Sequence, residues 1–563
     1  MLGSAYLILF IFFKCYNRKM SKFLNANNKF LTLLFFLIFF FIGIYIFSDY
    51  GLSIDEDNTR IIGFLSLEPI FKIFSPEHLT KINSIISGQL DENFTLDIIP
   101  TSGVAFDLPM AFLEFIFQIE DSRQYYLLRH FFTFLFFFIS SYFFYLIIKQ
   151  RYNSWFFSIL GTIMLIASPK IFANSFYNNK DIIFMSFFVI NLYLAIKFIE
   201  KQNYKTSIMF AIFSALMINV RILGLILPAI IIIIYIINIL RTEKNRKKTV
   251  RPLILFLILL PVFIFLFWPY LWSNPLENFL FSFKYLNDHI LTIHTFYLGQ
   301  YIFATSPPWH YHLVWILVST PLLYLSLFAV GFSFIFLRII KRLLKIEKND
   351  SYIDLWRGNK ELQDLIFFLT FLIPIIVAID FKSISYDGWR HLFFIYPSLL
   401  LIALQGLHLI KIKFFKKKNN YLYILIFILV LPNIYWMHKN HPHQNIYFNF
   451  FAGKNFNEKF EMDFSGLSNK QALEAIAKGE DRNVKIFNLS TADLNLSKSI
   501  LKKKIRQKIS IINDIDDADY IINNYRDWRG ITKPNDFVVP INFKIFYEIK
   551  VDGVSINTVY KKY

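Results

Sequence analysis

The chain contains a long series of apolar runs, each close to the length that crosses a bilayer. Residues 31–48, for example, read LTLLFFLIFFFIGIYIFS and carry no charged side chain. An α-helix needs about 20 apolar residues to span the hydrocarbon core, where every backbone polar group must be bonded within the segment. Hydrophobic residues make up 55% of the chain, which excludes an ordinary soluble globular protein. The sequence therefore predicts a polytopic α-helical membrane protein.

About eleven such runs can be recognised, so we expect about eleven transmembrane helices. The longest, residues 206–240, is interrupted by NVRILG, in which Arg221 and Gly224 predict a tight turn between two helices. The predicted spans are residues 31–48, 125–148, 154–173, 181–199, 206–220, 222–240, 252–270, 312–337, 363–380, 391–410 and 421–437.

The loops between these runs alternate in charge. Residues 14–22, 241–251 and 411–418 are strongly basic, whereas residues 49–124 on the opposite side are rich in Asp and Glu. Because basic loops stay in the cytoplasm, we predict a plasma-membrane protein, as in a bacterial inner membrane, with a cytoplasmic N-terminus and an extracytoplasmic C-terminus. The net charge of +19 lies in the short loops, so we expect no binding of nucleic acid.

Two regions outside the runs are predicted to fold on the outer side. The first is the loop 49–124, in which residues 75–88 and 103–119 have the apolar spacing of helices that lie on a membrane surface. The second is the tail 438–563, which has the composition of a soluble domain. The chain is thus divided into an N-terminal extension (1–30), a transmembrane domain (31–437) and the tail.

The tail mixes helical and strand patterns, which predicts a small extracytoplasmic α/β domain. Residues 467–479 have the pattern of a helix that stops at a glycine, and residues 543–562 that of a hairpin turning at Asp552-Gly553. Two further strands are expected at residues 483–490 and 518–526.

Ionisable side chains gather near the outer ends of the spans. Charged groups at membrane depth are costly and usually face a protein interior or a water-filled cavity, so their convergence on one side predicts a site there. Each of them taken singly could instead cap a helix or reach the lipid headgroups. They are Asp55, Glu56, Asp57, Arg129, His130, Lys180, Asp181, Arg221, Arg390 and His391.

The mixture of carboxylates and cations in this set points to a group-transfer reaction. A carboxylate can remove a proton from an acceptor hydroxyl, and Arg, Lys and His can neutralise a leaving phosphate. No phosphate-binding glycine loop or zinc-protease motif competes with this interpretation. The single cysteine, Cys15, excludes a disulfide framework and a cysteine-based zinc site.

Several stretches carry a resemblance to a known family. Asp55-Glu56 directly after the first span, Asp181 in SPKIFANSFYNNKDI, and the segments LLRH, RILG, PPWHYHLVWILVSTP, DGWRHLFFIYP and HPHQNIYFNFFAG are similar to stretches of GT-C glycosyltransferases. Within that superfamily the chain resembles glycosyltransferase family 39, which includes the protein O-mannosyltransferases and the lipid A aminoarabinose transferase. The resemblance runs through residues 31–480 and says nothing of the acceptor.

The resemblance implies an inverting transfer of a sugar from a polyprenyl-phosphate donor to an acceptor hydroxyl. Asp55 would be the base, assisted by Glu56, and Asp181 would orient the acceptor or a cation. Lys180, Arg390 and His391 would hold the phosphate, with Arg129 and Arg221 as second choices. GT-C enzymes differ in their need for a divalent metal, and we expect no obligatory metal or other cofactor here.

Two other functions remain open at this point. A flippase or transporter of a lipid-linked glycan would need charged groups along a path through the bilayer, and the middles of the runs are almost entirely apolar. A membrane scaffold would leave the gathered Arg, His and Asp side chains unexplained. The sugar stays undetermined, and so does the acceptor, which could be a lipid, a glycan or a protein.

Overall fold

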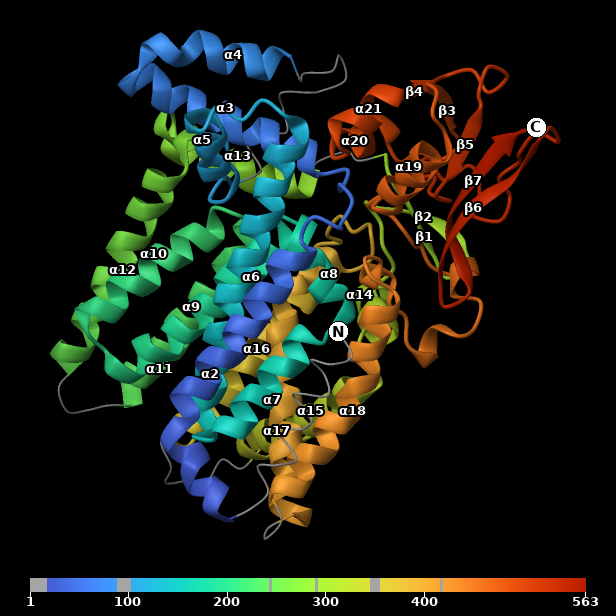
Figure 1. Ribbon diagram of the computed structural model, residues 1–563. Helices are drawn as coiled ribbons and strands as arrows, with labels where there is room; N and C mark the ends of the chain where they lie inside the picture. The colour runs from blue at the N-terminus through green and yellow to red at the C-terminus, as the bar shows by residue number, and fades with distance from the viewer. Residues whose placement is uncertain (1–17, 89–102, 242–245, 289–291, 345–354, 416–418) are drawn as a thin grey trace.

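The computed structural model describes residues 18–88, 103–241, 246–288, 292–344, 355–415 and 419–563, and it is a helix bundle with a small sheet domain at one end (Figure 1). Within these ranges, nine helices are long and apolar enough to cross a membrane. They are α2 (Arg18–Ile46), α6 (Ser122–Tyr152), α9 (Asp181–Lys201), α11 (Ile226–Arg241), α12 (Arg246–Phe267), α15 (Leu322–Leu344), α16 (Gly358–Asp380), α17 (Tyr396–Phe414) and α18 (Asn419–Lys439).

The other two predicted spans are present in altered form. The run at 206–220 is the shorter apolar helix α10 (Tyr204–Ile218). The run at 154–173 is broken into α7 (Trp155–Ile166) and α8 (Pro169–Tyr177), which meet at 68°. Proline lacks an N–H and pushes the residue before it out of the helical region, so Ser168 is extended, with φ −95° and ψ 102°. The polytopic helical fold is confirmed, and this span is corrected to a bent pair.

The boundary of one further span was predicted wrongly. Residues 312–337 do not form one helix, because α14 (Tyr311–Ser319) ends before Pro321 and α15 begins at Leu322. The residue before Pro321 is extended, with φ −101° and ψ 137°, again as expected of a residue that precedes proline. The apolar run is continuous in sequence, so its hydropathy gave no sign of the break.

Short helices cover the end of the bundle that carries the sheet domain (Figure 1). The two helices predicted in the loop 49–124 correspond to α4 (Leu79–Ser87) and α5 (Asp107–Ile116), and α13 (Pro275–Asp288) lies at the same end of the bundle. A further helix, α3 (Glu56–Phe74), was not predicted. The acidic residues Glu56 and Asp57 form its first turn, where negative charge complements the helix dipole.

The tail forms the predicted α/β domain. Its five-stranded sheet has the order β4-β3-β5-β7-β6, in which the first three strands are parallel and the last two form an antiparallel hairpin. The predicted strands and helix are confirmed as β3 (Val484–Asn488), β5 (Tyr520–Asn523), β6 (Phe543–Val551), β7 (Val554–Lys562) and α19 (Ser468–Gly479). The domain also contains β4 (Ile509–Ile512), α20 (Leu494–Ser499) and α21 (Lys503–Lys508).

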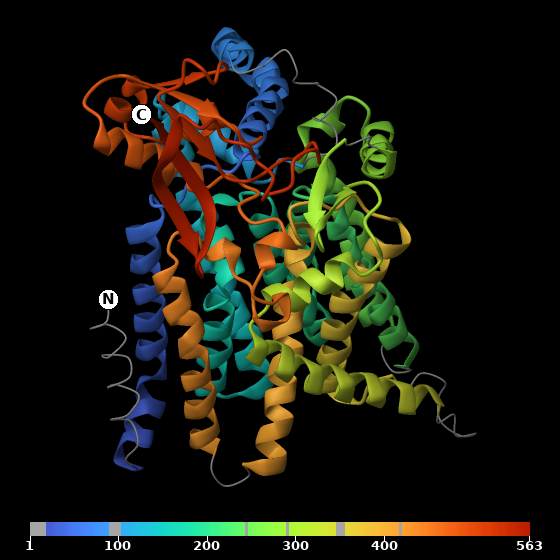
Figure 2. The ribbon, with the colours of Figure 1, turned by 90° about the vertical axis from the view of Figure 1, so that its right-hand side faces the viewer.

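The sheet domain packs directly on the segment that follows α2, at one end of the bundle (Figure 2). After α2, the backbone carbonyls of Ser48 and Asp49 accept hydrogen bonds of 2.7 and 2.9 Å from Lys470 Nζ. Gly51 lies so close to Leu467 that a Cβ there would be 2.2 Å from the Leu467 carbonyl oxygen. These contacts hold the domain over the end of the bundle, where the predicted site residues lie.

Candidate active site

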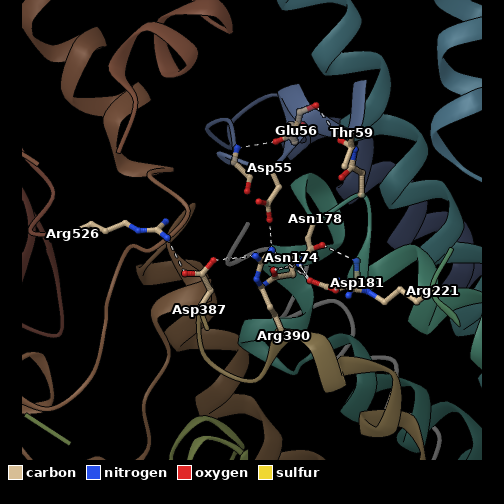
Figure 3. Close-up of polar contacts among 12 residues, drawn as sticks. Asp55, Glu56, Thr59, Asn174, Asn178, Asp181, Arg221, Asp387, Arg390 and Arg526 are labelled. Atoms are coloured by element: carbon tan, nitrogen blue, oxygen red, sulfur yellow. Dashed lines mark hydrogen bonds and ion pairs between the residues drawn. The ribbon is translucent and has the colours of Figure 1, made fainter. Parts of the chain in front are cut away.

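Four segments that are distant in sequence meet at the end of the bundle that carries the sheet domain (Figure 3). Arg390, at the start of the 3-10 turn Arg390–Ile395 that leads into α17, forms an ion pair with Asp55, the residue that precedes α3. The same guanidinium lies 3.8 Å from Asp181, the first residue of α9. Arg221, from the turn between α10 and α11, pairs with the other oxygen of Asp181. The fold thus brings four of the predicted site residues together.

The Asp181 carboxylate is held by its own helix terminus. Asn178 donates to Asp181 Oδ2 at 3.0 Å and accepts from the Asp181 backbone N–H at 2.9 Å. Asn178 also donates to Asn174 of α8 at 3.0 Å. Asn174, Asn178 and Asp181 therefore form one chain of hydrogen bonds that leads from α8 to the start of α9 and fixes the direction of the Asp181 side chain.

The segment YDGWRH places Arg390 through a tight turn. Asp387 and Gly388 both have positive φ, 56° and 74°, a backbone conformation that glycine adopts freely and aspartate tolerates. The turn directs the Asp387 carboxylate to within 3.1 Å of Arg390. The Tyr386 ring lies under the guanidinium, 4.9 Å from its carbon, at a distance typical of a cation–π contact.

The sheet domain adds a residue that sequence reasoning missed. Arg526, just after β5, lies 3.0 Å from Asp387, and both side chains are only 2% exposed. Asp387 stood in a segment singled out for Arg390 and His391, but it was not itself selected. Arg526 stands in the soluble tail, about 135 residues further along, where no local pattern marks it. We call Asp55, Asp181, Arg221, Asp387, Arg390 and Arg526 the outer charge cluster.

Asp55 is the accessible carboxylate of this cluster. Its side chain is 36% exposed, whereas that of Asp181 is 1% exposed and that of Asp387 is 2% exposed. Burial raises the pKa of Asp55, but the charge and hydrogen bond of Arg390 outweigh this and hold the pKa below its usual range. Asp55 is therefore ionised at neutral pH and can accept a proton.

Lys180 lies beside the cluster, immediately before α9. Burial and the charge of Arg221 lower its pKa, and Asp107, Asp55 and Asp181 oppose the effect, so that the pKa is about 8. Desolvation disfavours the charged form of a lysine, and an incoming anion would restore it. His391 follows Arg390 and packs edge-on against Tyr386, with ring centroids 4.9 Å apart.

Glu56 and Arg129 belong to a different network. The Glu56 carboxylate is buried, accepting from the Ser53 backbone N–H at 2.9 Å and lying 3.0 Å from His130 Nε2. Arg129 is fully buried and pairs with Glu114 of α5 at 2.8 Å. Thus Glu56 follows Asp55 directly in sequence but points the other way. These contacts tie α3 and α5 to α6 rather than adding to the outer charge cluster.

Over the described ranges, no group of three or more His, Cys, Asp or Glu side chains is arranged to hold a metal ion. The carboxylates of the outer charge cluster are instead paired with guanidinium groups.

Part of the chain matches a family of known glycosyltransferases. Residues 108–268 match the family described as dolichyl-phosphate-mannose-protein mannosyltransferase. This range contains α5 to α12 and the site residues Lys180, Asp181 and Arg221. The predicted resemblance to the protein mannosyltransferases, within the GT-C glycosyltransferases, is thus found over this part of the chain.

Two solved structures are also similar to the chain. Both are of ArnT from Cupriavidus metallidurans, one in the apo state and one bound to undecaprenyl phosphate. Each is 10% identical to this chain, and the likeness covers 94% of this chain and 97% of that chain, with TM-scores of 0.42 and 0.41 respectively. No curated protein sequence matches the chain.

Proposed function

We propose that the protein is a membrane glycosyltransferase that moves a sugar from a polyprenyl-phosphate donor to an acceptor hydroxyl, with inversion. The observation that carries this proposal is the outer charge cluster. It combines one accessible carboxylate with buried cations at the end of a transmembrane bundle. The match of residues 108–268 to a mannosyltransferase family supports the same reaction class.

Asp55 is the proposed general base. It takes the proton of the acceptor hydroxyl as that oxygen attacks the anomeric carbon from the face opposite the phosphate. The bond between the anomeric carbon and the phosphate oxygen breaks, and its electrons leave with the polyprenyl phosphate. Arg390 and Lys180 neutralise the charge that develops on the phosphate, with His391 and Arg221 beside them.

Donor binding and base activation are linked in this proposal. In the structure, Arg390 is paired with Asp55, and this pairing lowers the pKa of the carboxylate. A donor phosphate competes for the same guanidinium, because a planar fork binds phosphate in two places. When Arg390 turns to the phosphate, Asp55 loses its partner and becomes a stronger base. Removal of the proton from the acceptor hydroxyl by Asp55 would then be favoured only once the donor is bound.

The remaining predicted site residues are proposed to act by holding others in place. Asp181 orients Arg221 and lies near Arg390, so it sets the positions of the phosphate-binding cations. Glu56 and Arg129 fix the outer helices through His130 and Glu114. This changes the roles expected of Glu56, as an assistant to the base, and of Arg129, as a second-choice phosphate ligand.

The flippase alternative would need a charged path, and none runs through the middle of the described helices α6, α9 and α16. In the helices α6, α9 and α16, the buried polar side chains at mid-length are uncharged, and they include Ser140, Asn191 and Thr370. We propose a plasma-membrane location with the cluster on the extracytoplasmic side. Reporters fused after Lys418 and after Tyr563 should then report opposite sides, and a shared side would contradict this topology.

The test uses the purified full-length protein and a panel of labelled polyprenyl-phosphate sugars. We expect one of them to release undecaprenyl phosphate and to pass its sugar to an envelope acceptor. Membranes from cells that lack the protein would supply unmodified acceptor. A comparison of their sugars with those of wild-type membranes would show which sugar is missing. Transbilayer movement of the labelled lipid without bond cleavage would contradict the proposal and support the flippase.

A further inference from the structure

The outer charge cluster contains a contact between the transmembrane domain and the sheet domain. Asp387 lies between two guanidinium groups, with Arg390 at 3.1 Å and Arg526 at 3.0 Å (Figure 3). Arg390 comes from the transmembrane domain, and Arg526 comes from the sheet domain. One carboxylate, that of Asp387, therefore connects the sheet domain to Arg390, the proposed phosphate ligand.

The loop that carries Arg526 is held firmly within the sheet domain. The backbone carbonyl of Arg526 accepts from the Thr491 backbone N–H at 2.9 Å and from its hydroxyl at 3.1 Å. Before it, Asn524 donates to the backbone of Asp463 at 3.1 Å. Beyond it, the loop is also held from outside the domain, because the Trp528 carbonyl accepts from the backbone N–H of His294, in the strand β1 (His294–Tyr297), at 2.8 Å. Arg526 is thus a fixed charge rather than a mobile surface side chain.

The charges around Asp387 determine what removing Arg526 would do. Asp387 is buried, and the cations that face it are Arg526 and Arg390, while the other anions nearby are Asp55 and Asp181. Glu461, 3.7 Å from Arg526, is the second carboxylate that this arginine serves. A buried carboxylate that loses one of two cations is drawn more strongly to the other. Without Arg526, Asp387 would hold Arg390 more tightly.

We propose that Arg526 is a positioning residue of the active site: it balances Asp387, and so leaves Arg390 available to an anionic phosphate. The sheet domain is then a working part of the site, which is incomplete without it. This inference rests on the proposed function, because it takes Arg390 as a ligand of the donor phosphate. Arg526 itself is not expected to touch the donor.

The test measures binding of undecaprenyl phosphate to the purified full-length protein, so that the sugar need not be known. We expect Arg526→Gln to weaken binding about tenfold, because Asp387 retains Arg390. Adding Asp387→Asn should restore binding to within about twofold of wild type, since the competing carboxylate is then neutral. An arginine that only stabilised the fold would leave the affinity of folded Arg526→Gln for undecaprenyl phosphate unchanged. Arg526→Lys, which keeps the positive charge, should bind nearly as well as wild type.

Arg529 supplies the matched control. It lies three residues further on in the same loop and pairs with Asp527 at 3.0 Å, but its side chain is 51% exposed and makes no contact with Asp387. Arg529→Gln should leave binding unchanged. Wild-type affinity in Arg526→Gln would overturn the inference, and so would a weakened Arg526→Gln that Asp387→Asn fails to restore.

A second measurement separates this inference from the proposed function. Thermal unfolding of the two single variants and the double variant forms a cycle that needs no ligand. We expect the double variant to lose less in Tm than the sum of the two single losses. If wild type fails to bind undecaprenyl phosphate, the proposed donor is wrong, whereas additive Tm losses would overturn the contact itself.

Discussion

Two buried charge clusters lie at opposite ends of the helix bundle. They differ in whether one of their carboxylates is accessible to solvent. The inner cluster consists of Arg151, Arg338, Asp364 and Gln405, at the far end of α6 from the sheet domain. The outer charge cluster lies beneath the sheet domain. Both contain more than one arginine around a carboxylate that is about 1% exposed, Asp364 in one and Asp181 in the other.

The inner cluster is closed on itself. Asp364 accepts from Arg151 and, at 3.0 Å, from Arg338, while Gln405 accepts from Arg151 at 3.1 Å and from Tyr152 at 3.0 Å. These contacts join α6, α15, α16 and α17, and the Asp364 carboxylate is covered from solvent. Such an arrangement fixes the positions of the helices and leaves the Asp364 carboxylate closed to solvent.

The outer charge cluster also combines arginine and aspartate side chains, but one of its carboxylates is exposed to solvent. Asp55 is 36% exposed, and its partner Arg390 is shared with two other carboxylates. A shared cation can be taken over by a new anion at lower cost than a cation bound to one partner. Buried charge in a membrane protein therefore does not mark a site by itself. Incomplete and accessible pairing is the more informative feature.

The largest effect is expected for Asp55→Asn, which should abolish transfer without loss of stability. Asparagine keeps the shape of the side chain but cannot take the proton, and loss of a positioned base costs about 10²–10⁴ in rate. The measurement is kcat in a preparation whose Tm matches wild type. Glu56→Gln is the neighbouring control and should keep most of the rate, because Glu56 faces His130. Near-normal turnover in Asp55→Asn would remove the base from this position.

The same kind of change at the inner cluster should act on stability instead. Asp364→Asn leaves Arg151 and Arg338 buried without their counter-charge, which should lower the free energy of unfolding by about 3–5 kcal/mol. The kcat per folded molecule should stay within about twofold of wild type. Thermal unfolding in detergent and turnover corrected for the folded fraction would test this. A kcat that falls tenfold in folded protein would show that the inner cluster serves the reaction after all.

Arg390→Lys should lower the rate at least tenfold, about 1.4 kcal/mol of barrier. Lysine keeps the charge but loses the planar fork that binds a phosphate in two places, and the loss grows as charge builds on the leaving phosphate. Expression and Tm should be unchanged. Full activity in Arg390→Lys would mean that a point charge suffices, and the phosphate site would then move toward Lys180 or Arg221.

The smallest effect concerns pH. The pKa of Lys180 is about 8, so the lysine is charged below that pH and becomes neutral above it. Because the charged form binds the donor phosphate, kcat/KM should fall above about pH 8, by up to about tenfold per pH unit. Lys180→Arg, which stays charged, should abolish this decline up to about pH 10. A decline that persists in Lys180→Arg would belong to another group.

The membrane architecture could be predicted because it rests on local properties. Runs of apolar residues such as 31–48 have one stable environment, and the helix follows from the need to pair every backbone polar group. The hairpin at Asp552-Gly553 could likewise be predicted, because its turn depends on neighbouring residues. The breaks at Pro169 and Pro321 were missed because hydropathy averages over them, although the prolines themselves carried the signal.

The site was predictable only in part, for the same reason. Asp55, Asp181 and Arg390 could be selected because each is a charged residue at the edge of an apolar run, where its cost demands an explanation. That argument cannot say which way a side chain points. Glu56 is next to Asp55, yet the turn that starts α3 directs one carboxylate to Arg390 and the other to His130.

The sequence by itself determined the polytopic helical architecture, most of the spans, the α/β domain of the tail and most of the charged residues that gather beside it. Only the tertiary structure decided how these charges are paired. It joined Arg526 to Asp387 across about 140 residues of chain, and it closed the inner cluster while leaving Asp55 open. The physical reason is the range of the forces involved. Hydropathy and backbone hydrogen bonding act between near neighbours, whereas an ion pair depends on where the fold brings two distant side chains.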